Sequence, residues 1–340
     1  MRIAQVATLA APVRPDTGGS GSVEALVWSL TRHLTDMGHD VTVFGAAGGC
    51  VPGEYVATLP GPYGENDAPD DWMLCEWLNL CAAVEQSGRF DVLHSHAYLW
   101  GMPLGSLARA PIVHTMHVWP YDDSARLWRR NPSAHVTALT RAQWRDYADL
   151  EPIAFVPHGI EPDAFPFVPR AGADACFLGR FIPGKGALEA ITAARAAGIK
   201  LILAGPANDY YEGQIAPLVD GASVEYVGPV DGRDRATLLG QSGVLLAPFQ
   251  APEPFSLVLV EAMMCGTPVV TTGVGAAPEV VDEGVTGFCA STAAELSARL
   301  HDALALDRAV VRKRAEARFA AARMARDYLD VYEQVIGAAR

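Results

Sequence analysis

The sequence lacks several patterns that would place it in a familiar class of protein. Its six cysteines include no C-x-x-C pair, so we interpret them as reduced thiols of a cytoplasmic protein rather than as a metal or redox site. No apolar run approaches the roughly 18 residues of a membrane-spanning helix, and residues 2–7 are expected to form a strand, not a signal peptide. Lys and Arg number 26 against 39 Asp and Glu, a formal net charge of −13 that argues against nucleic acid as a partner.

Two nucleotide-binding motifs are also missing. A nicotinamide dehydrogenase would need a G-x-G-x-x-G turn with an acidic residue about 20 positions further on, and neither half of the chain has one. The glycine-rich segment 17–22 does not end in the Gly-Lys-Ser/Thr of a P-loop. Its glycines could still let the backbone approach a ligand closely, and a plain flexible loop is the alternative.

The 340 residues, 50% of them hydrophobic, suffice for two domains with separate cores. Short apolar runs alternate with amphipathic helical patterns, which predicts two doubly wound parallel sheets. The expected strands of the first sheet are 2–7, 40–44, 91–95, 111–115, 135–139 and 153–157, and those of the second are 174–178, 200–204, 223–227, 243–247, 267–271 and 286–290. The proline-rich segment 158–169 is the expected linker. Because ligands bind beyond the carboxyl ends of parallel strands, two such domains would hold one in a cleft between them.

The segment from Glu253 to Glu261 sets two carboxylates eight positions apart, across a change from loop to helix. Ser256 is the expected N-cap, and the first amides of the helix should attract an anion. We expect the carboxylates to lie roughly 8–12 Å apart. That is further than the roughly 5 Å of a retaining glycosidase pair, so each would hold different hydroxyls of an extended ligand. A solvated glutamate beside a helix cap is the alternative for either residue alone.

A second candidate loop, 179–186, follows the expected strand 174–178. It carries Arg180 and Lys185, which could stabilise the charge on a diphosphate leaving group. Solvated surface cations are the alternative interpretation.

Histidines cluster at two strand ends: His94 and His96 in one, His114 and His117 in the other. They could bond sugar hydroxyls or deliver a proton near neutral pH. Zinc binding is disfavoured, because no cysteine or carboxylate completes a ligand set and the strand period splits the histidines between faces. For His94 and His114 a satisfied core histidine is favoured.

Taken together, the E-x7-E element, the G-R-x4-K-G loop, the early Gly-Gly loop, the V-P-x-G-I linker and the terminal YLDVYEQV helix resemble retaining glycosyltransferases of the family-4 type. The resemblance implies the GT-B fold, in which two Rossmann-like domains face a deep cleft. It assigns residues 1–157 to an acceptor-side domain, 158–319 to a donor-binding domain, and about 320–340 to a helix that returns to the first domain.

By that resemblance, the catalytic residues would be Glu253 on the donor sugar, Arg180 and Lys185 on the diphosphate, and His117 beside the reacting carbon. Glu261 would contact the ribose and His96 the acceptor. The remaining donor contacts would come from Gly18, Gly19, Phe255, Ser256, Leu257, Val258, Gly228, Pro229 and Val230. Two departures concern the donor sugar: Ser256 stands where the family usually has glycine, and His158 where asparagine is common.

The implied reaction transfers a sugar from a nucleotide-diphosphate sugar, UDP with GDP as the alternative, to an acceptor hydroxyl by front-side attack. No side-chain nucleophile and no D-x-D motif is evident, so cations and helix amides would replace a metal ion, and no cofactor is expected. The alanine-rich, arginine-rich composition suits an actinobacterial antibiotic or other natural product as the acceptor.

Three alternatives stay open at this point. A nucleotide-sugar epimerase would need no acceptor, and a non-catalytic nucleotide-sugar-binding protein would transfer nothing. The segment 126–130, with Arg141 and Arg145, could touch anionic lipid headgroups, but a solvated helix face is favoured in so acidic a chain.

Overall fold

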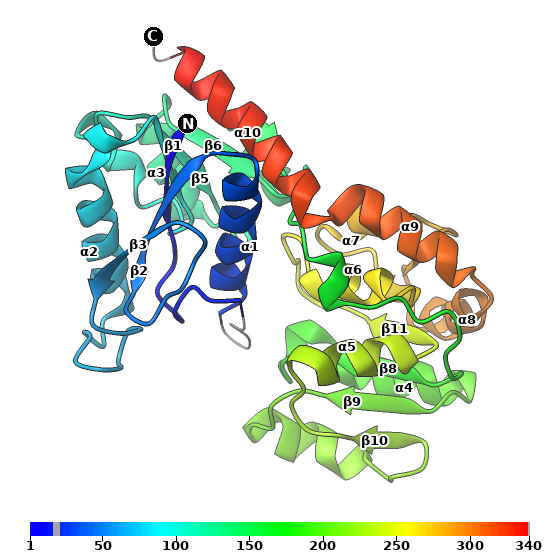
Figure 1. The fold of residues 1–340 in the computed structure, drawn as a ribbon. Coiled ribbons are helices and arrows are strands. Elements are labelled where there is room, and N and C mark those ends of the chain that lie inside the picture. The colour runs from blue at the N-terminus through cyan, green and yellow to red at the C-terminus, as the bar shows by residue number, and fades with distance from the viewer. Residues whose placement is uncertain (16–20, 339–340) are drawn as a thin grey trace. The chain divides into compact units, whose positions relative to one another are not determined.

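The computed structural model describes residues 1–15 and 21–338. Contacts between residues divide the chain into two compact units (Figure 1). Unit 1 comprises Met1–Gly159 and Ala321–Arg340, and unit 2 comprises Ile160–Ala320. The boundary predicted after residue 157 and the returning helix predicted from about residue 320 are close to these limits. Among the described residues, no helix is long and apolar enough to cross a membrane.

Unit 1 is built on a parallel sheet of seven strands in the order β3-β2-β1-β4-β5-β6-β7. The strands are β1 (Arg2–Val6), β2 (Asp40–Ala46), β3 (Glu54–Leu59), β4 (Val92–Ser95), β5 (Ile112–Thr115), β6 (His135–Ala138) and β7 (Ala154–Phe155). Its helices are α1 (Ser22–Asp36), α2 (Trp72–Glu85), α3 (Asp122–Arg130) and α10 (Ala321–Ala338). The strand order reverses between β1 and β4, which is where ligands bind in folds of this kind.

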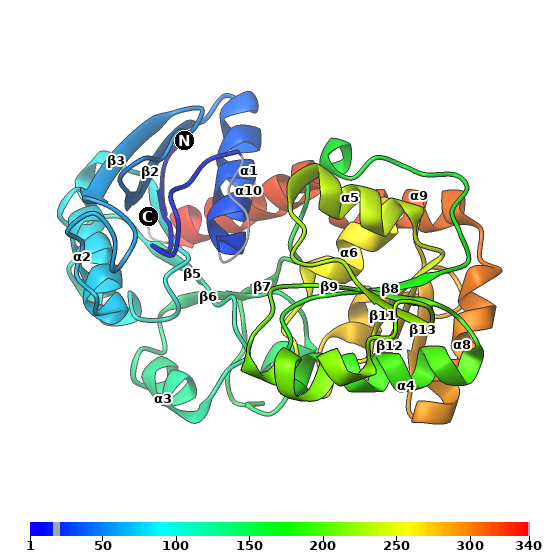
Figure 2. The same ribbon diagram turned by 90° about the horizontal axis from the view of Figure 1, so that it is seen from below.

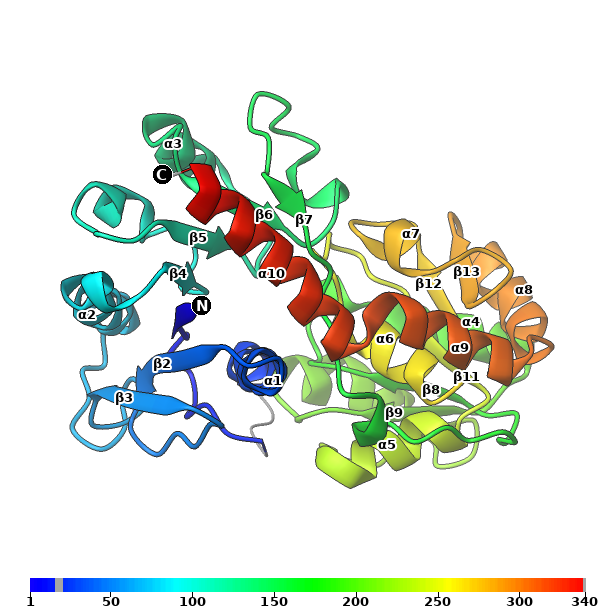
Figure 3. The ribbon, with the colours of Figure 1, turned by 45° about the horizontal axis from the view of Figure 1, so that its top comes forward.

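The alternation of side chains along the strands separates two cores in unit 1. Ile3, Val92 and Val113 face α1 and α10, and the adjacent residues Ala4, Leu93 and Ile112 face α2. Figure 3 looks onto α10, whose buried Tyr328 and Tyr332 belong to the first of these cores. The last helix of the chain is therefore an integral layer of unit 1.

Unit 2 has a parallel sheet of six strands in the order β10-β9-β8-β11-β12-β13. The strands are β8 (Ala175–Leu178), β9 (Leu201–Ala204), β10 (Val224–Tyr226), β11 (Val244–Ala247), β12 (Val269–Thr272) and β13 (Gly287–Ala290). Its helices are α4 (Ala187–Ala197), α5 (Gly232–Gln241), α6 (Leu257–Met264), α7 (Ala277–Val280), α8 (Ala293–Leu304) and α9 (Arg308–Phe319). In Figure 2 the strands lie between α4 on one face and α5 and α6 on the other. The order reverses between β8 and β11.

Both sheets thus have the doubly wound order of the Rossmann fold, so the predicted fold class is confirmed. The sequence predicted every strand except β3. The six cysteines are all free, and burial raises the pKa of the Cys176 thiol to about 11 and that of Cys265 to about 12.

Candidate functional site

The loop after β8 carries the two predicted cations. Arg180 is exposed, and its side chain has no ion pair or hydrogen bond to another described residue. The next residue, Phe181, is fully buried among aromatic rings and anchors the loop. Lys185 ends a short 3₁₀ turn over Pro183–Lys185, and Gly186 follows with φ +78°. A Cβ atom at Gly186 would lie 2.0 Å from the carbonyl oxygen of Pro248, so only glycine fits this close approach.

Glu253 follows β11, the strand beside β8, and meets Lys185 directly. The Lys185 Nζ atom lies 2.8 Å from Oε1 of Glu253. The two loops are also joined by their backbones, because Gln250 N donates to the carbonyl of Gly184 at 2.9 Å. On the other side, the carbonyl of Glu253 accepts from Ala276 N at 3.0 Å. The structure therefore holds these two predicted site residues together at the point where the strand order reverses.

Gly275 brings the backbone after β12 against Glu253. Its φ is +63°, and a Cβ atom there would lie 2.5 Å from the Glu253 nitrogen. Any larger residue at Gly275 would displace the carboxylate, so this glycine is a positioning residue that the sequence reasoning missed.

The start of α6 departs from the prediction in one respect. Ser256 occupies the N-cap position, but its side chain makes no capping hydrogen bond, and its φ is +69°. The left-handed conformation explains why glycine would be the ordinary choice here. Phe255 is buried against Phe319, and Leu257 and Val258 keep part of their surface exposed. The first amides of α6 have no partner within the helix, as expected for an anion site.

Glu261 is buried on the second turn of α6 and forms an ion pair with Arg235 of α5. Burial raises the pKa of the Glu261 carboxyl, and the positive charge of Arg235 opposes that shift. Sequence reasoning missed Arg235, because a single arginine in a polar helix carries no motif. The predicted contact between Glu261 and a ribose stays a prediction.

The predicted base-framing segment, Gly228–Val230, follows β10 at the same edge of the sheet. The carbonyl of Gly228 accepts from Gly205 N at 3.0 Å, and Pro229 is exposed. A Cβ atom at Gly205 would lie 2.1 Å from the carbonyl oxygen of Gly179, so the ends of β8 and β9 approach closely. Of the other predicted contacts, Gly18 and Gly19 lie outside the described residues.

In unit 1 the histidines form a chain of hydrogen bonds that begins at Gln5 of β1. His96 Nε2 lies 2.8 Å from Gln5 Oε1, and His96 Nδ1 lies 3.0 Å from His117 Nε2. His117 Nδ1 lies 3.3 Å from His158 Nε2. Because an amide oxygen only accepts, His96 carries its proton on Nε2, and in neutral rings both His117 and His158 then donate from Nε2. We call these four residues the histidine chain.

The histidine chain is neutral at physiological pH. Burial lowers the pKa of His117. It lowers the pKa values of His96 and His158 well below the ordinary value, and positive charge on neighbouring side chains lowers them further. A neutral imidazole can hydrogen-bond a sugar hydroxyl, but it is a poor proton donor near neutral pH. The lowered pKa values thus argue against the proton-donor role, and both ring nitrogens of His96 and His117 are already bonded within the chain.

His94 and His114 differ from each other. Both ring nitrogens of His94 are bonded, Nδ1 to Tyr332 and Nε2 to Thr115, which ties β4 and β5 to α10. His114 points to the opposite face of the sheet, and its Nδ1 has no partner among the described residues. Burial lowers its pKa to about 3. Of these two residues, His94 is the satisfied core histidine that the sequence favoured, and His114 is not.

The arginines considered for lipid binding are largely paired with neighbouring acids. Arg126 pairs with Asp123, Arg129 with Asp149 and Arg145 with Asp146. Arg141 stacks over the ring of Phe155. These contacts agree with a solvated helix face. Within residues 1–15 and 21–338, no group of three or more His, Cys, Asp or Glu side chains is placed to hold a metal ion.

Two family models match the chain in succession. Residues 21–164 match the model described as Glycosyltransferase Family 4, and residues 168–322 match the one described as Glycosyl transferases group 1. Among curated relatives, the D-inositol 3-phosphate glycosyltransferases of Mycobacterium tuberculosis and Mycobacterium bovis are 29% identical to this chain over 352 residues. That match covers 85% of the chain and 72% of each relative.

Solved structures with the same fold cover nearly the whole chain. AviGT4, a glycosyltransferase involved in avilamycin A biosynthesis, has a TM-score of 0.73 at 24% identity, covering 99% of this chain and 98% of its own. Sucrose-phosphate synthase from Thermosynechococcus elongatus has a TM-score of 0.78 at 20% identity, covering 99% of each chain. HepE from Anabaena, solved with UDP and glucose, has a TM-score of 0.72 at 19% identity and covers 98% of this chain and 100% of its own. These likenesses support the GT-B class of fold.

Proposed function

We propose that this chain is a retaining glycosyltransferase that uses a nucleotide-diphosphate sugar, because a Glycosyltransferase Family 4 model and a Glycosyl transferases group 1 model match it in succession. The donor is a UDP-sugar, with GDP as the alternative base, and the acceptor is a hydroxyl of a small natural product such as an antibiotic. The solved neighbours that carry UDP or act in avilamycin A biosynthesis suit this proposal.

The observation that carries the proposal is the ion pair between Lys185 and Glu253 at the reversal of strand order in unit 2. As the glycosidic bond breaks, negative charge collects on the diphosphate and positive charge on the sugar ring. Lys185 and Arg180 stabilise the diphosphate, together with the first amides of α6, and Glu253 holds sugar hydroxyls beside it. The acceptor attacks the face that the leaving group vacates, and a phosphate oxygen takes its proton.

No metal ion is assigned a step in this mechanism. Two cations and the positive end of a helix dipole supply the charge that Mg²⁺ would otherwise provide. Both ring nitrogens of His96 and His117 are bonded within the histidine chain, so a contact of His117 with the sugar or of His96 with the acceptor requires one of these hydrogen bonds to be exchanged for one to a hydroxyl.

A thermal-stability scan against UDP-, GDP-, ADP- and dTDP-sugars tests the donor. A ligand at about 100 times its Kd stabilises the folded state by about 2.7 kcal/mol, so one base should raise Tm clearly above the others. Product analysis with that donor then separates a transferase from an epimerase, which would release an isomer without any acceptor. Retention is read from the anomeric configuration of the product by NMR, and metal independence from turnover in EDTA. No stabilisation by any of the four donors would refute the proposal.

A further inference from the structure

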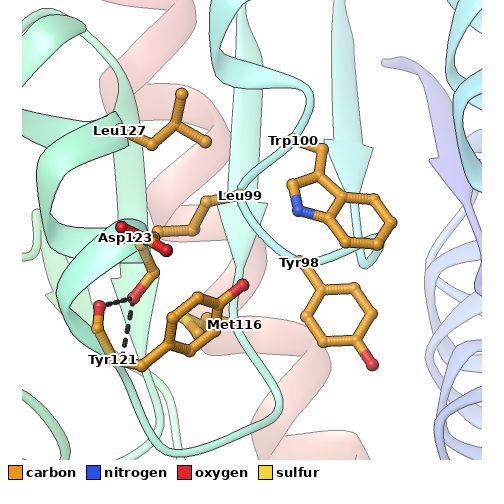
Figure 4. Close-up of a pocket in the computed structure, with 8 residues that line it drawn as sticks. Tyr98, Leu99, Trp100, Met116, Tyr121, Asp123 and Leu127 are labelled. Carbon is orange, nitrogen blue, oxygen red and sulfur yellow. Dashed lines mark hydrogen bonds between the residues drawn. The ribbon is translucent and has the colours of Figure 1, made fainter. Parts of the chain in front are cut away.

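Aromatic side chains that follow β4 line a pocket of about 240 Å³ in the described part of unit 1. Its floor is formed by Leu99 and Met116, both buried. Figure 4 shows Tyr98 and Trp100 on one side of it and Tyr121 and Leu127 on the other. Met116 directly precedes His117, and Tyr98 follows His96 by two positions, so the pocket is built from the same segments after β4 and β5 that carry these two histidines. We name it the aromatic pocket.

The aromatic wall of this pocket is held together by ring contacts. The rings of Tyr98 and Trp100 stack with centroids 4.7 Å apart, and Trp72 of α2 packs on both, at 5.6 Å and 5.0 Å. Tyr98 has φ +51°, a conformation that costs a non-glycine residue energy and is retained where the surroundings enforce it. Flat, preorganised rings of this kind offer apolar faces to a ring-shaped ligand at low entropic cost.

The lining of the aromatic pocket holds a single ionic side chain. Among the eight described residues that line it this is Asp123, which is paired with Arg126 of the same helix at 3.3 Å. The α3 helix begins at the pocket, but its first turn already holds Asp122 and Asp123. The Ser124 hydroxyl accepts from Tyr121 N at 3.0 Å, which occupies one of the amides at that helix start. A phosphate would therefore have to compete with Asp123 for Arg126, because the lining itself supplies carboxylate and apolar rings but no cation.

We infer that the aromatic pocket binds the acceptor, and that this acceptor is an uncharged, ring-shaped molecule with an apolar face and a hydroxyl near Asp123. The inference rests on the proposed function, since only a transferase needs an acceptor. It separates this chain from the D-inositol 3-phosphate glycosyltransferases it is similar to, whose name specifies a phosphorylated acceptor.

Binding to the full chain tests the inference with a matched pair of probes, phenyl β-glucoside and its 6-phosphate, followed by saturation-transfer NMR and titration. We expect the neutral probe to bind at least about tenfold more tightly than the phosphorylated one, a difference of about 1.4 kcal/mol. Tyr121→Ala and Trp100→Ala should each weaken the neutral probe by a similar factor. Tyr121 is 46% exposed, so its truncation leaves the core of unit 1 unchanged.

Trp77→Ala is the matched control, because Trp77 lies on the exposed face of α2 and does not line the pocket. We expect it to bind both probes as the wild type does. Asp123→Arg should narrow the preference for the neutral probe, since a cation would then stand at the rim. Stabilisation by nucleotide sugars is measured in parallel for every variant.

Equal or tighter binding of the phosphorylated probe overturns the inference. So does a neutral probe that fails to bind the wild type, or that binds Tyr121→Ala and Trp100→Ala as tightly as it binds the wild type. If nucleotide sugars stabilise the protein in these same preparations, the proposed function stands although the acceptor assignment has failed. Loss of nucleotide-sugar binding in the wild type would instead remove the proposed function itself.

Discussion

Lys185 and Glu253, which the sequence assigned to the diphosphate and the sugar of one donor, form an ion pair in unit 2 with Nζ and Oε1 2.8 Å apart. The Lys185 ammonium also lies 5.2 Å from the ring centre of Phe249. The side chain of Lys185 is 17% exposed and that of Glu253 is 26% exposed. A partly exposed ion pair of this kind contributes at most about 1 kcal/mol to stability. The pair therefore matters mainly because it fixes the position of both groups before a substrate arrives.

Lys185→Ala and Glu253→Ala should each lower turnover by about 100-fold or more, because each removes an interaction that strengthens as charge develops in the transition state. Tm should stay close to that of the wild type. Initial rates with the donor identified by thermal scan, together with a denaturation curve, check both statements. Near-normal turnover in either variant would contradict the assigned roles.

Lys200→Ala provides the control for this prediction. Lys200 pairs with Glu225 at 2.7 Å in the same unit, but it precedes β9 and lies at the amino edge of the sheet. We expect the Lys200→Ala variant to show normal turnover.

The double exchange Lys185→Glu with Glu253→Lys keeps an ion pair but reverses its direction, so this variant should be inactive. Recovery of activity in the exchanged pair would show that the ion pair itself, and not the placement of each charge, is what catalysis needs.

Most of the fold could be predicted from the sequence, because a strand of a parallel sheet buried on both faces is a short apolar run bounded by turns. The exception is instructive. β3 lies at the edge of its sheet with only Leu59 buried, and the proline and glycine pairs on both sides of Glu54–Leu59 favour a loop in the sequence. Its partners on β2, beginning with Thr42 against Glu54, could be recognised only from the structure.

The site was predictable where a motif carried it and not where partners come from elsewhere in the chain. Arg180, Lys185 and Glu253 stand in recognisable spacings, and parallel topology brings their strands together. Arg235, Gly275 and Gln5 have no local signal, because each acts on a residue distant in sequence. The positive φ of Ser256 is also absent from any pattern, since serine is an ordinary N-cap residue.

Ser256→Gly should stabilise the protein by about 1 kcal/mol. Relief of the left-handed conformation at φ +69° gains roughly 1–2 kcal/mol, and the greater freedom of glycine in the unfolded chain offsets part of it. Ser256→Val should destabilise, because a β-branched side chain tolerates this conformation less well. Urea unfolding of the two variants beside the wild type gives the sign of each change. A stabilising valine or a destabilising glycine would show that the backbone here is not strained.

The histidine chain should stay neutral as the pH falls through 6.5, where an exposed histidine takes up a proton, because burial lowers the pKa of each ring. In the unfolded chain these histidines take up protons near their ordinary pKa of about 6.5, whereas the folded rings do not. The free energy of unfolding is therefore unaffected by them above that pH and decreases progressively below it. Gln5→Glu puts a carboxylate beside His96 Nε2 and should raise the pKa of that ring. Titration of the ring nitrogens by NMR checks both points. A wild-type midpoint near 6.5 at His96 or His117 would contradict the neutral chain.

Glu76 of α2 should limit stability at alkaline pH. It is buried, its Oε1 accepts from Leu9 N at 3.0 Å, and burial raises its pKa to about 8. Its neighbour Glu24 holds the same loop through Ala10 N at 2.9 Å, and burial raises the pKa of that carboxyl too. Because the unfolded carboxyl ionises near its ordinary pKa while the folded one stays protonated, stability is greatest below about pH 4.5 and falls as pH rises to about 8.

Glu76→Gln should remove that loss, since a neutral amide can accept the Leu9 hydrogen bond at every pH. At about pH 8 the free energy of unfolding of the variant should exceed that of the wild type by a few kcal/mol, because each unit of pKa shift corresponds to about 1.4 kcal/mol. At about pH 4 the two proteins should be equally stable. Glu85→Gln, an exposed position of the same helix, is the control and should change neither value. Guanidinium unfolding at the two pH values measures the difference. A gain of equal size at both pH values would point to packing, and no gain at pH 8 would mean that Glu76 is already ionised at little cost in the folded protein.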